Sequence, residues 1–331
     1  MPSLYTTETE HALEAVIRAA TLCQQVQREM VSSAAVQKAD RSPVTVADYA
    51  SQAVICRGLA DAFPGDPVVA EETAESLRQP DQAPMLAQVT NYVRTCLPGA
   101  VPAEICAWID HGGAEPGPRF WTLDPIDGTK GFLRGEQYAV ALALVVNAQV
   151  QLGALACPNL PLDLSQPNAA RGVVFLAVRD QGAKMYPLDG GPARSIAVSS
   201  PTAPQATRFV ESFEAGHTNH AGHSSLVHAL GITQPSLRLD SQAKYGVVAR
   251  GDAAIYLRLP SPRTPEYRER IWDHAAGALI VEEAGGRVTD ALGTDLDFSR
   301  GRQLSQNRGI VVSNGFLHSV ILDEIQNRGL T

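Results

Sequence analysis

The sequence has few cysteines, and none are arranged for a disulfide framework or a zinc site. Its five cysteines are scattered along 331 residues without a CxxC pair, and their number is odd. Closely spaced cysteine pairs are typical of zinc sites, and an even set of cysteines is typical of small disulfide-bonded domains. Neither is expected here, and the composition is typical of a protein from a reducing compartment.

The sequence also lacks a basic excess, a signal peptide and a membrane-spanning run. Lys and Arg total 27 against 35 Asp and Glu, a net charge of −8, which excludes a protein that holds nucleic acid by charge alone. The longest uncharged stretch, residues 137–162, is interrupted by polar residues. Residues 1–10 have no basic segment followed by an apolar one. We therefore expect a cytoplasmic protein with neither a nucleic-acid nor a membrane partner.

The remaining pattern is that of a globular α/β protein. The chain is 44% apolar, and a chain of this length buries about 75% of the surface that it exposes when unfolded. Apolar residues at 13, 16, 17 and 20 predict a helix, and residues 138–146 and 149–157 predict two buried strands. Further strands are expected at 68–70, 105–110, 120–123, 172–179, 183–187, 209–212, 237–240, 253–259, 287–290 and 309–313, and further helices from Thr45 and at 85–97, 224–231, 241–250 and 273–284.

The alternation of strands and helices changes after residue 158. Before it, the pattern predicts an N-terminal α+β part (1–158), and after it, shorter alternating units predict a C-terminal α/β part (159–331). We expect the two parts to form one layered α/β (α+β) structure, with a functional site between them.

Residues 124–129, DPIDGT, contain the most informative carboxylates. Asp124 and Asp127 flank a proline that stiffens the corner after a predicted strand, and Gly128 and Thr129 follow with free backbone N–H groups. Carboxylate oxygens of this kind select Mg²⁺ or Mn²⁺ over zinc, and the N–H groups suit a phosphate. Taken alone, however, the segment reads first as an Asp-rich turn.

Three further carboxylates each allow two interpretations. Glu71 follows a predicted buried strand and is expected to emerge at a sheet edge, where α/β ligand sites lie. Asp273 precedes an Ala- and Gly-rich helix, so it is a candidate N-cap, a candidate cation ligand, or both. Asp48 stands three residues after Thr45, a spacing that a capping box explains without any catalytic role.

Together these segments resemble a known superfamily. DPIDGT (124–129) and WDHAAG (272–277) are similar to the two signature motifs of the inositol monophosphatase superfamily of lithium-sensitive, magnesium-dependent phosphomonoesterases. Three other segments, SPVTVADYA (42–50), LDSQAKY (239–245) and AIYLRL (254–259), resemble the 3'(2'),5'-bisphosphate nucleotidase branch. The resemblance extends from about residue 38 to about residue 314 and weakens between 78 and 118. It implies a layered α-β-α-β-α sandwich of the inositol monophosphatase and fructose-1,6-bisphosphatase type.

The resemblance also implies roles for individual residues. The metal ligands are Glu71, Asp124, Asp127 and Asp273, with the Ile126 carbonyl, around two or three Mg²⁺ ions. Asp48 and Thr129, hydrogen-bonded to each other, activate the attacking water. Glu71 takes part in catalysis as well as in metal binding. The substrate contacts are Gly128, Thr129, His217, Ser241, Lys244, Arg258 and Asp273.

The implied substrate is a small nucleotide, 3'-phosphoadenosine 5'-phosphate, which is hydrolysed to AMP and phosphate by a monomeric enzyme. Activity on 3'-phosphoadenylyl sulfate is also expected. A Lys and an Arg suit a second phosphate, although a solvated helix residue and a strand-edge charge explain Lys244 and Arg258 locally. The run His217, His220, His223 lacks an adjacent carboxylate, which disfavours a transition-metal site. Two alternatives remain: an inositol phosphate phosphatase and a non-catalytic bisphosphate sensor.

Overall fold

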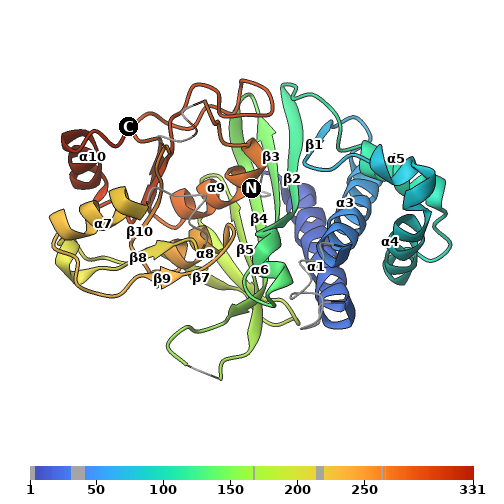
Figure 1. The fold of residues 1–331 in the computed structure, drawn as a ribbon, viewed down its shortest axis with the longest axis horizontal. Helices are drawn as coiled ribbons and strands as arrows, with labels where there is room; N and C mark the ends of the chain where they lie inside the picture. Colours follow the sequence, from blue (N-terminus) through green and yellow to red (C-terminus); the bar gives the residue numbers. More distant parts are fainter. Residues whose placement is uncertain (1–3, 31–41, 167, 214–219, 262–263, 265) are drawn as a thin grey trace.

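The computed structural model arranges the chain in five layers: helix, sheet, helix, sheet and helix (Figure 1). It describes residues 4–30, 42–166, 168–213, 220–261, 264 and 266–331. These layers are the ones that the sequence resemblance implies. Within the described ranges, no helix has both the length and the apolar character that crossing a membrane requires. The five cysteines are free.

The helices lie in three separate layers (Figure 1). The N-terminal layer holds α1 (Thr6–Met30), α3 (Ser42–Ala62), α4 (Ala83–Cys96) and α5 (Pro102–Asp110), with 3-10 turns η1 (Ser76–Arg78) and η2 (Pro80–Gln82). The middle layer holds α8 (Ala243–Ala249) and α9 (Ala275–Glu283), and the outer layer holds α7 (His220–Ala229) and α10 (His318–Asn327). The short elements α6 (Thr129–Leu133), η3 (Pro204–Ala206) and η5 (Ile271–Asp273) lie in connections.

The first sheet has seven strands in the order of the chain. They are β1 (Val68–Ala70), β2 (Arg119–Asp127), β3 (Ala139–Val146), β4 (Gln149–Pro161), β5 (Arg171–Val178), β6 (Ala183–Pro187) and β7 (Arg194–Ile196). β1 pairs parallel to β2, and every other neighbouring pair is antiparallel. The expected hairpin at 172–187 is confirmed as β5 and β6.

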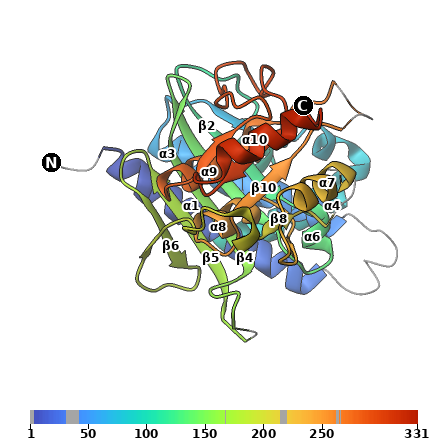
Figure 2. The ribbon, with the colours of Figure 1, turned by 90° about the vertical axis from the view of Figure 1, so that its left-hand side faces the viewer.

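The second sheet has five strands in the order β11-β12-β10-β8-β9. They are β8 (Phe209–Glu211), β9 (Leu237–Arg238), β10 (Ile255–Arg258), β11 (Arg287–Thr289) and β12 (Ile310–Ser313). Figure 2 is viewed from the outer helical layer and shows α7 and α10 in front of this sheet. A separate apolar core joins these helices to the sheet.

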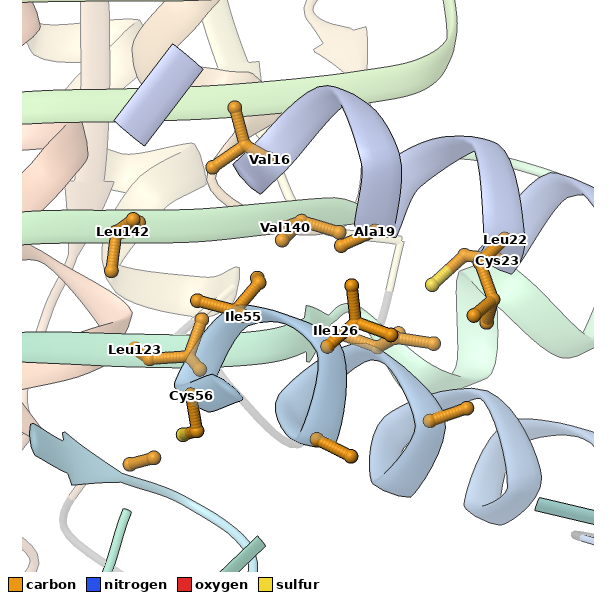
Figure 3. Packing of buried hydrophobic residues seen from close by; sticks show 14 of the residues in the cluster. Val16, Ala19, Leu22, Cys23, Ile55, Cys56, Leu123, Ile126, Val140 and Leu142 are labelled. Carbon is orange, nitrogen blue, oxygen red and sulfur yellow. The ribbon is translucent and has the colours of Figure 1, made fainter. Parts of the chain in front are cut away.

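The sequence of β3 explains why helices cover both faces of the first sheet. Successive side chains of a strand point to opposite faces. Val140 and Leu142 accordingly pack in the core that contains α1 and α3, as Figure 3 shows, whereas Ala141 and Ala143 pack in the core that contains α8 and α9. A strand buried on both faces has a continuous apolar sequence, which is the pattern of this segment.

The middle helical layer approaches the sheet very closely at one point. A Cβ atom added to Gly153 of β4 would lie 2.8 Å from the carbonyl oxygen of Ala276 in α9. Only glycine allows this approach, because such a distance is shorter than any normal contact of a Cβ atom. The contact fixes the start of α9, and with it the neighbouring Asp273, against the first sheet.

Two sequence predictions in the N-terminal part are wrong. Residues 105–110 belong to α5 and not to a strand, because Pro102 occupies the first helical turn and the Glu104 side chain accepts a hydrogen bond from the Val101 N–H group at 3.2 Å. Thr45 is not an N-cap, because α3 already begins at Ser42. Asp48 therefore lies inside the helix and has no capping role.

The predicted boundary at residue 158 coincides with no break between elements. It falls inside β4, and the first sheet continues to Ile196. The division into 1–158 and 159–331 stays a prediction about the organisation of the chain.

Candidate active site

A cavity of about 570 Å³ opens where β2 ends. It is bordered by α6, by the residues before and within α8, and by η5. Most of the site residues expected from the sequence line it: Glu71, Asp124, Ile126, Asp127, Gly128, Thr129, Ser241, Lys244, Arg258 and Asp273. Asp48 is not in the cavity wall, and His217 lies outside the described residues, as does the side chain of His220.

A bulge in β2 turns both aspartates of the DPIDGT segment into the cavity. Residues three apart in a regular strand point to opposite faces of the sheet. The pairing of β2 with β3 shifts register between Asp124 and Asp127, and such an irregularity re-aims the side chains beyond it. Both carboxylates therefore reach the same cavity.

The turn that follows requires a glycine. Gly128 has φ 92°, in the left-handed region, and a Cβ atom there would lie 2.9 Å from the Cβ atom of Ser241. Glycine alone adopts this φ without strain and leaves room for Ser241. The turn thus brings the N-terminal motif against the segment that carries the predicted substrate-binding residues.

Strand register places Glu71 beside Asp124. Ala70 pairs with Leu123 in the parallel β1–β2 pair, so the next residues on both strands are neighbours. The two carboxyl groups are therefore close enough to influence each other's pKa. Asp273 reaches the same place from η5.

The crowding of these carboxyl groups raises their pKa values. Desolvation within the cluster, with the charges of Asp273, Glu72 and Asp127, raises the pKa of Glu71 to about 8. Desolvation and the Asp127 charge raise the pKa of Asp273 to about 6. Burial raises the pKa of Asp124 well above its usual value. Like charges this close favour protonation or a bound cation.

The donor set suits a hard divalent cation. Asp124 is 2% exposed, and its Oδ1 is a buried oxygen without a hydrogen-bond partner among the described residues. Buried polar atoms normally have a partner, so the missing one is informative. Carboxylate and carbonyl oxygens are the ligands that Mg²⁺ prefers.

Asp48 lies beneath this cluster in α3. It is 5% exposed, and its Oδ1 likewise has no partner among the described residues. Burial, followed by the charges of Glu72 and Glu71, raises its pKa well above the usual value. No hydrogen bond joins Asp48 to Thr129 within the part of the chain that the structure describes, so the pair implied by the resemblance stays a prediction.

Cationic side chains also line the cavity. Lys244 is 4% exposed, and burial lowers its pKa to about 8. Its Nζ lies 5.2 Å from the centroid of the Tyr256 ring. The Nε atom of Arg258 lies 2.9 Å from a carboxylate oxygen of Glu269, and its Nη1 lies 3.9 Å from Asp273. The cavity therefore carries cationic groups beside the carboxylate cluster.

A second group of potential metal ligands is better explained as a hydrogen-bond network. Ligand atoms of Glu269, Asp273 and His274 lie within 4.8 Å of one another. Both ring nitrogens of His274 already have partners: Nε2 lies 3.2 Å from Glu269, and Nδ1 lies 2.7 Å from the Tyr245 hydroxyl. Glu269 is also paired with Arg258.

Sequence reasoning missed two arginines of the cavity wall. Arg270 and Arg302 both lie against the Trp272 ring, at 5.7 Å and 4.9 Å from its centroid. Arg270 is two residues before the WDHAAG motif, and this proximity is the sequence signal that could have indicated it. Arg302 stands in a loop without any motif, so no local pattern could have indicated it.

Comparison with known proteins gives a consistent result. Residues 5–330 match the inositol monophosphatase family. A 3'(2'),5'-bisphosphate nucleotidase of Oryza sativa is 45% identical over 341 residues, covering 98% of this chain and 94% of the relative. Proteins of the same name from Emericella nidulans and Schizosaccharomyces pombe are 42% and 40% identical, covering 94% and 95% of this chain and 95% and 94% of the relatives.

Solved structures confirm the fold. The inositol monophosphatase from Anabaena superposes with a TM-score of 0.62 at 21% identity, covering 97% of this chain and 96% of that chain. An inositol monophosphatase from Zymomonas mobilis gives a TM-score of 0.63 at 19% identity, covering 98% and 99%. At these identities the likeness concerns the fold alone.

Proposed function

We propose that this chain, which belongs to the inositol monophosphatase family, is a 3'(2'),5'-bisphosphate nucleotidase that removes the 3'-phosphate of 3'-phosphoadenosine 5'-phosphate. The products are AMP and inorganic phosphate, and 3'-phosphoadenylyl sulfate is a second substrate. The relatives named above, at 40–45% identity over nearly their whole length, support this reaction.

One observation carries the proposal: a single cavity joins the carboxylates of both motifs to Lys244 and Arg258. A bisphosphate needs a cation-binding end for the phosphate that is cleaved and a cationic group for the phosphate that is retained. Charge-assisted hydrogen bonds from Lys and Arg suit the second task. An inositol monophosphate leaves this second group without a partner, so the arrangement favours the nucleotide.

The family is one of metal-dependent phosphatases, and the cluster fits Mg²⁺, with two or three ions per site. Glu71, Asp124, Asp127, Asp273 and the Ile126 carbonyl would hold the ions. When bound, Mg²⁺ supplies Lewis-acid stabilisation of the phosphate and of the leaving oxygen, and it makes water nucleophilic near neutral pH. A cation would also relieve the repulsion that raises the pKa values of these acids.

The chain's own residues orient the reactants. Gly128 and Thr129 line the cavity, where their N–H groups would hold oxygens of the scissile phosphate. We assign Asp48 and Thr129 to orienting and deprotonating the attacking water. Ser241, Lys244 and Arg258, with His217, would bind the nucleotide, and a bound phosphate would keep Lys244 charged.

Phosphate release tests the proposal. With Mg²⁺ present, 3'-phosphoadenosine 5'-phosphate is expected to be hydrolysed with a higher kcat/KM than inositol 1-phosphate or inositol 1,4-bisphosphate. A preference for either inositol compound would replace the proposal by an inositol phosphate phosphatase. Tight binding of the nucleotide without phosphate release would identify a sensor instead.

A further inference from the structure

A buried glutamine connects the two motifs that carry the candidate metal ligands. Gln242 precedes α8 and is 2% exposed. Its backbone N–H donates to Oδ2 of Asp127 at 2.5 Å. Its side-chain Nε2 donates to the carbonyl oxygen of Trp272 at 2.9 Å, and its Oε1 accepts from the Gly277 N–H at 3.2 Å. One residue therefore bonds to the DPIDGT segment and to both ends of the WDHAAG segment.

The backbone of Ser241, the residue before Gln242, has an unfavourable conformation that allows the bond from the Gln242 N–H to Asp127. Ser241 has φ 66°, in the left-handed region that only glycine adopts without penalty. For another residue this conformation costs roughly 1–2 kcal/mol. It turns the chain so that the next N–H group points at Asp127. Strain of this kind persists only where surrounding contacts hold it, and functional sites are where it gathers.

The side-chain amide is fixed at both ends. Because Nε2 and Oε1 bond to different backbone groups, the amide cannot rotate without breaking one bond and leaving a buried group unpaired. Leaving such a group unpaired costs about 1–3 kcal/mol. The Trp272 carbonyl belongs to the residue directly before Asp273, so the amide restrains the backbone that carries this carboxylate.

We infer that Gln242 is a positioning residue that sets the separation of the Asp127 and Asp273 carboxylates, and through it the affinity of the site for Mg²⁺. The inference rests on the proposed function, because it takes these two residues as cation ligands. Groups that orient metal ligands affect metal affinity strongly, and their loss typically costs about 10–100-fold. Gln242 itself is not among the proposed ligands.

A purely structural role predicts something different. If Gln242 only joined α8 to α9, its loss would lower the melting temperature and leave the Mg²⁺ dependence unchanged. The distinguishing quantity is therefore the Mg²⁺ concentration at which the melting temperature begins to rise, because stabilisation by a bound ion grows as RT ln(1 + [Mg²⁺]/Kd). This measurement needs neither substrate nor turnover.

The test compares Gln242→Met with Asn314→Leu in the full chain. Both changes replace a buried amide side chain by an apolar side chain of similar size that cannot form these hydrogen bonds. Asn314 is fully buried, and its side-chain bonds go to residues outside both motifs: it donates to the carbonyl oxygens of Ser199 and Pro201 at 3.1 and 2.9 Å and accepts from Leu317 N–H at 3.3 Å. Neutral replacements avoid adding a charge that would itself attract Mg²⁺.

Both variants are expected to melt at a lower temperature than the wild type in the absence of metal. In Gln242→Met the rise in melting temperature is expected to begin at a Mg²⁺ concentration at least about tenfold higher than in the wild type. In Asn314→Leu it is expected to begin at the wild-type concentration. Equal Mg²⁺ dependence in all three proteins would overturn the inference and leave the proposed function intact. Should Gln242→Met not fold, Gln242→Ala, which makes no steric demand, carries the same comparison. A wild type whose melting temperature does not respond to Mg²⁺ would overturn the proposed metal site and the inference with it.

Discussion

The guanidinium group of Arg302 lies 4.9 Å from the centroid of the Trp272 ring and donates hydrogen bonds to the carbonyl oxygens of Ala70 and Ala114. Ala70 is the last residue of β1 and directly precedes Glu71. Trp272 directly precedes Asp273. One side chain from a C-terminal loop therefore joins the backbone before one candidate ligand to the residue before another.

Replacing Arg302 by methionine is expected to weaken this junction. The change keeps most of the apolar stem but removes both hydrogen bonds and the cation–π contact. We expect a loss of about 1–3 kcal/mol in the free energy of unfolding, measured by urea denaturation, and reduced phosphatase activity. Arg300→Met, at a largely exposed side chain paired only locally with Asp297, serves as the control and is expected to change stability by less than about 0.5 kcal/mol. Equal effects of both changes would contradict the role given to Arg302.

Asp48→Asn is expected to lower kcat by roughly two orders of magnitude, because the amide cannot accept the proton of the attacking water. The side chain keeps its size, so KM and the Mg²⁺-induced rise in melting temperature should change little. Steady-state phosphate release at saturating Mg²⁺ provides the measurement. Asp61→Asn, on the exposed face of the same helix, is the matched control and should retain full activity. A fully active Asp48→Asn enzyme would remove Asp48 from the mechanism.

Lys244→Met is expected to raise KM for 3'-phosphoadenosine 5'-phosphate by about tenfold or more, because a charged hydrogen bond to the retained phosphate is lost. The comparison substrate is adenosine 3'-phosphate, which has no 5'-phosphate. Its KM should be nearly the same for the wild type and for Lys244→Met. The ratio of the two KM values is the measurement. If the variant weakened both substrates equally, Lys244 would act on something other than the 5'-phosphate.

Buried His318 is expected to contribute to the loss of stability at acid pH. Burial lowers its pKa from 6.5 to about 4, and its ring bonds to Thr289 and Ser313 at 2.9 Å each. Between these two pKa values the unfolded chain binds a proton that the folded chain does not, so stability falls as the pH drops through that window. His318→Gln removes this contribution. The free energy of unfolding, measured in urea at about pH 7 and about pH 5, should therefore fall less in the variant than in the wild type. An identical fall would mean that other groups account for the acid loss.

The local sequence pattern was sufficient to predict a helix or strand where the residues of that element alone decide its type. The apolar spacing around Val16 indicated α1, and the apolar sequence at 138–146 indicated the buried strand β3. It failed at residues 105–110, where a short apolar run fits a strand and a helix equally well and the proline at 102 decides the matter. The start of α3 was misjudged because Thr45 is as acceptable inside a first turn as before it.

By itself, the sequence determined the chemistry of this protein: hard oxygen donors in two motifs, a Lys and an Arg further on, and the glycine that the turn after Asp127 demands. Covalent order specifies residue types and their local geometry. Only the tertiary structure decided how these groups meet, since the β2 bulge, the parallel register that sets Glu71 beside Asp124, and the links through Gln242 and Arg302 all join segments that are distant along the chain. Such contacts depend on packing between layers, and no spacing within one segment encodes them.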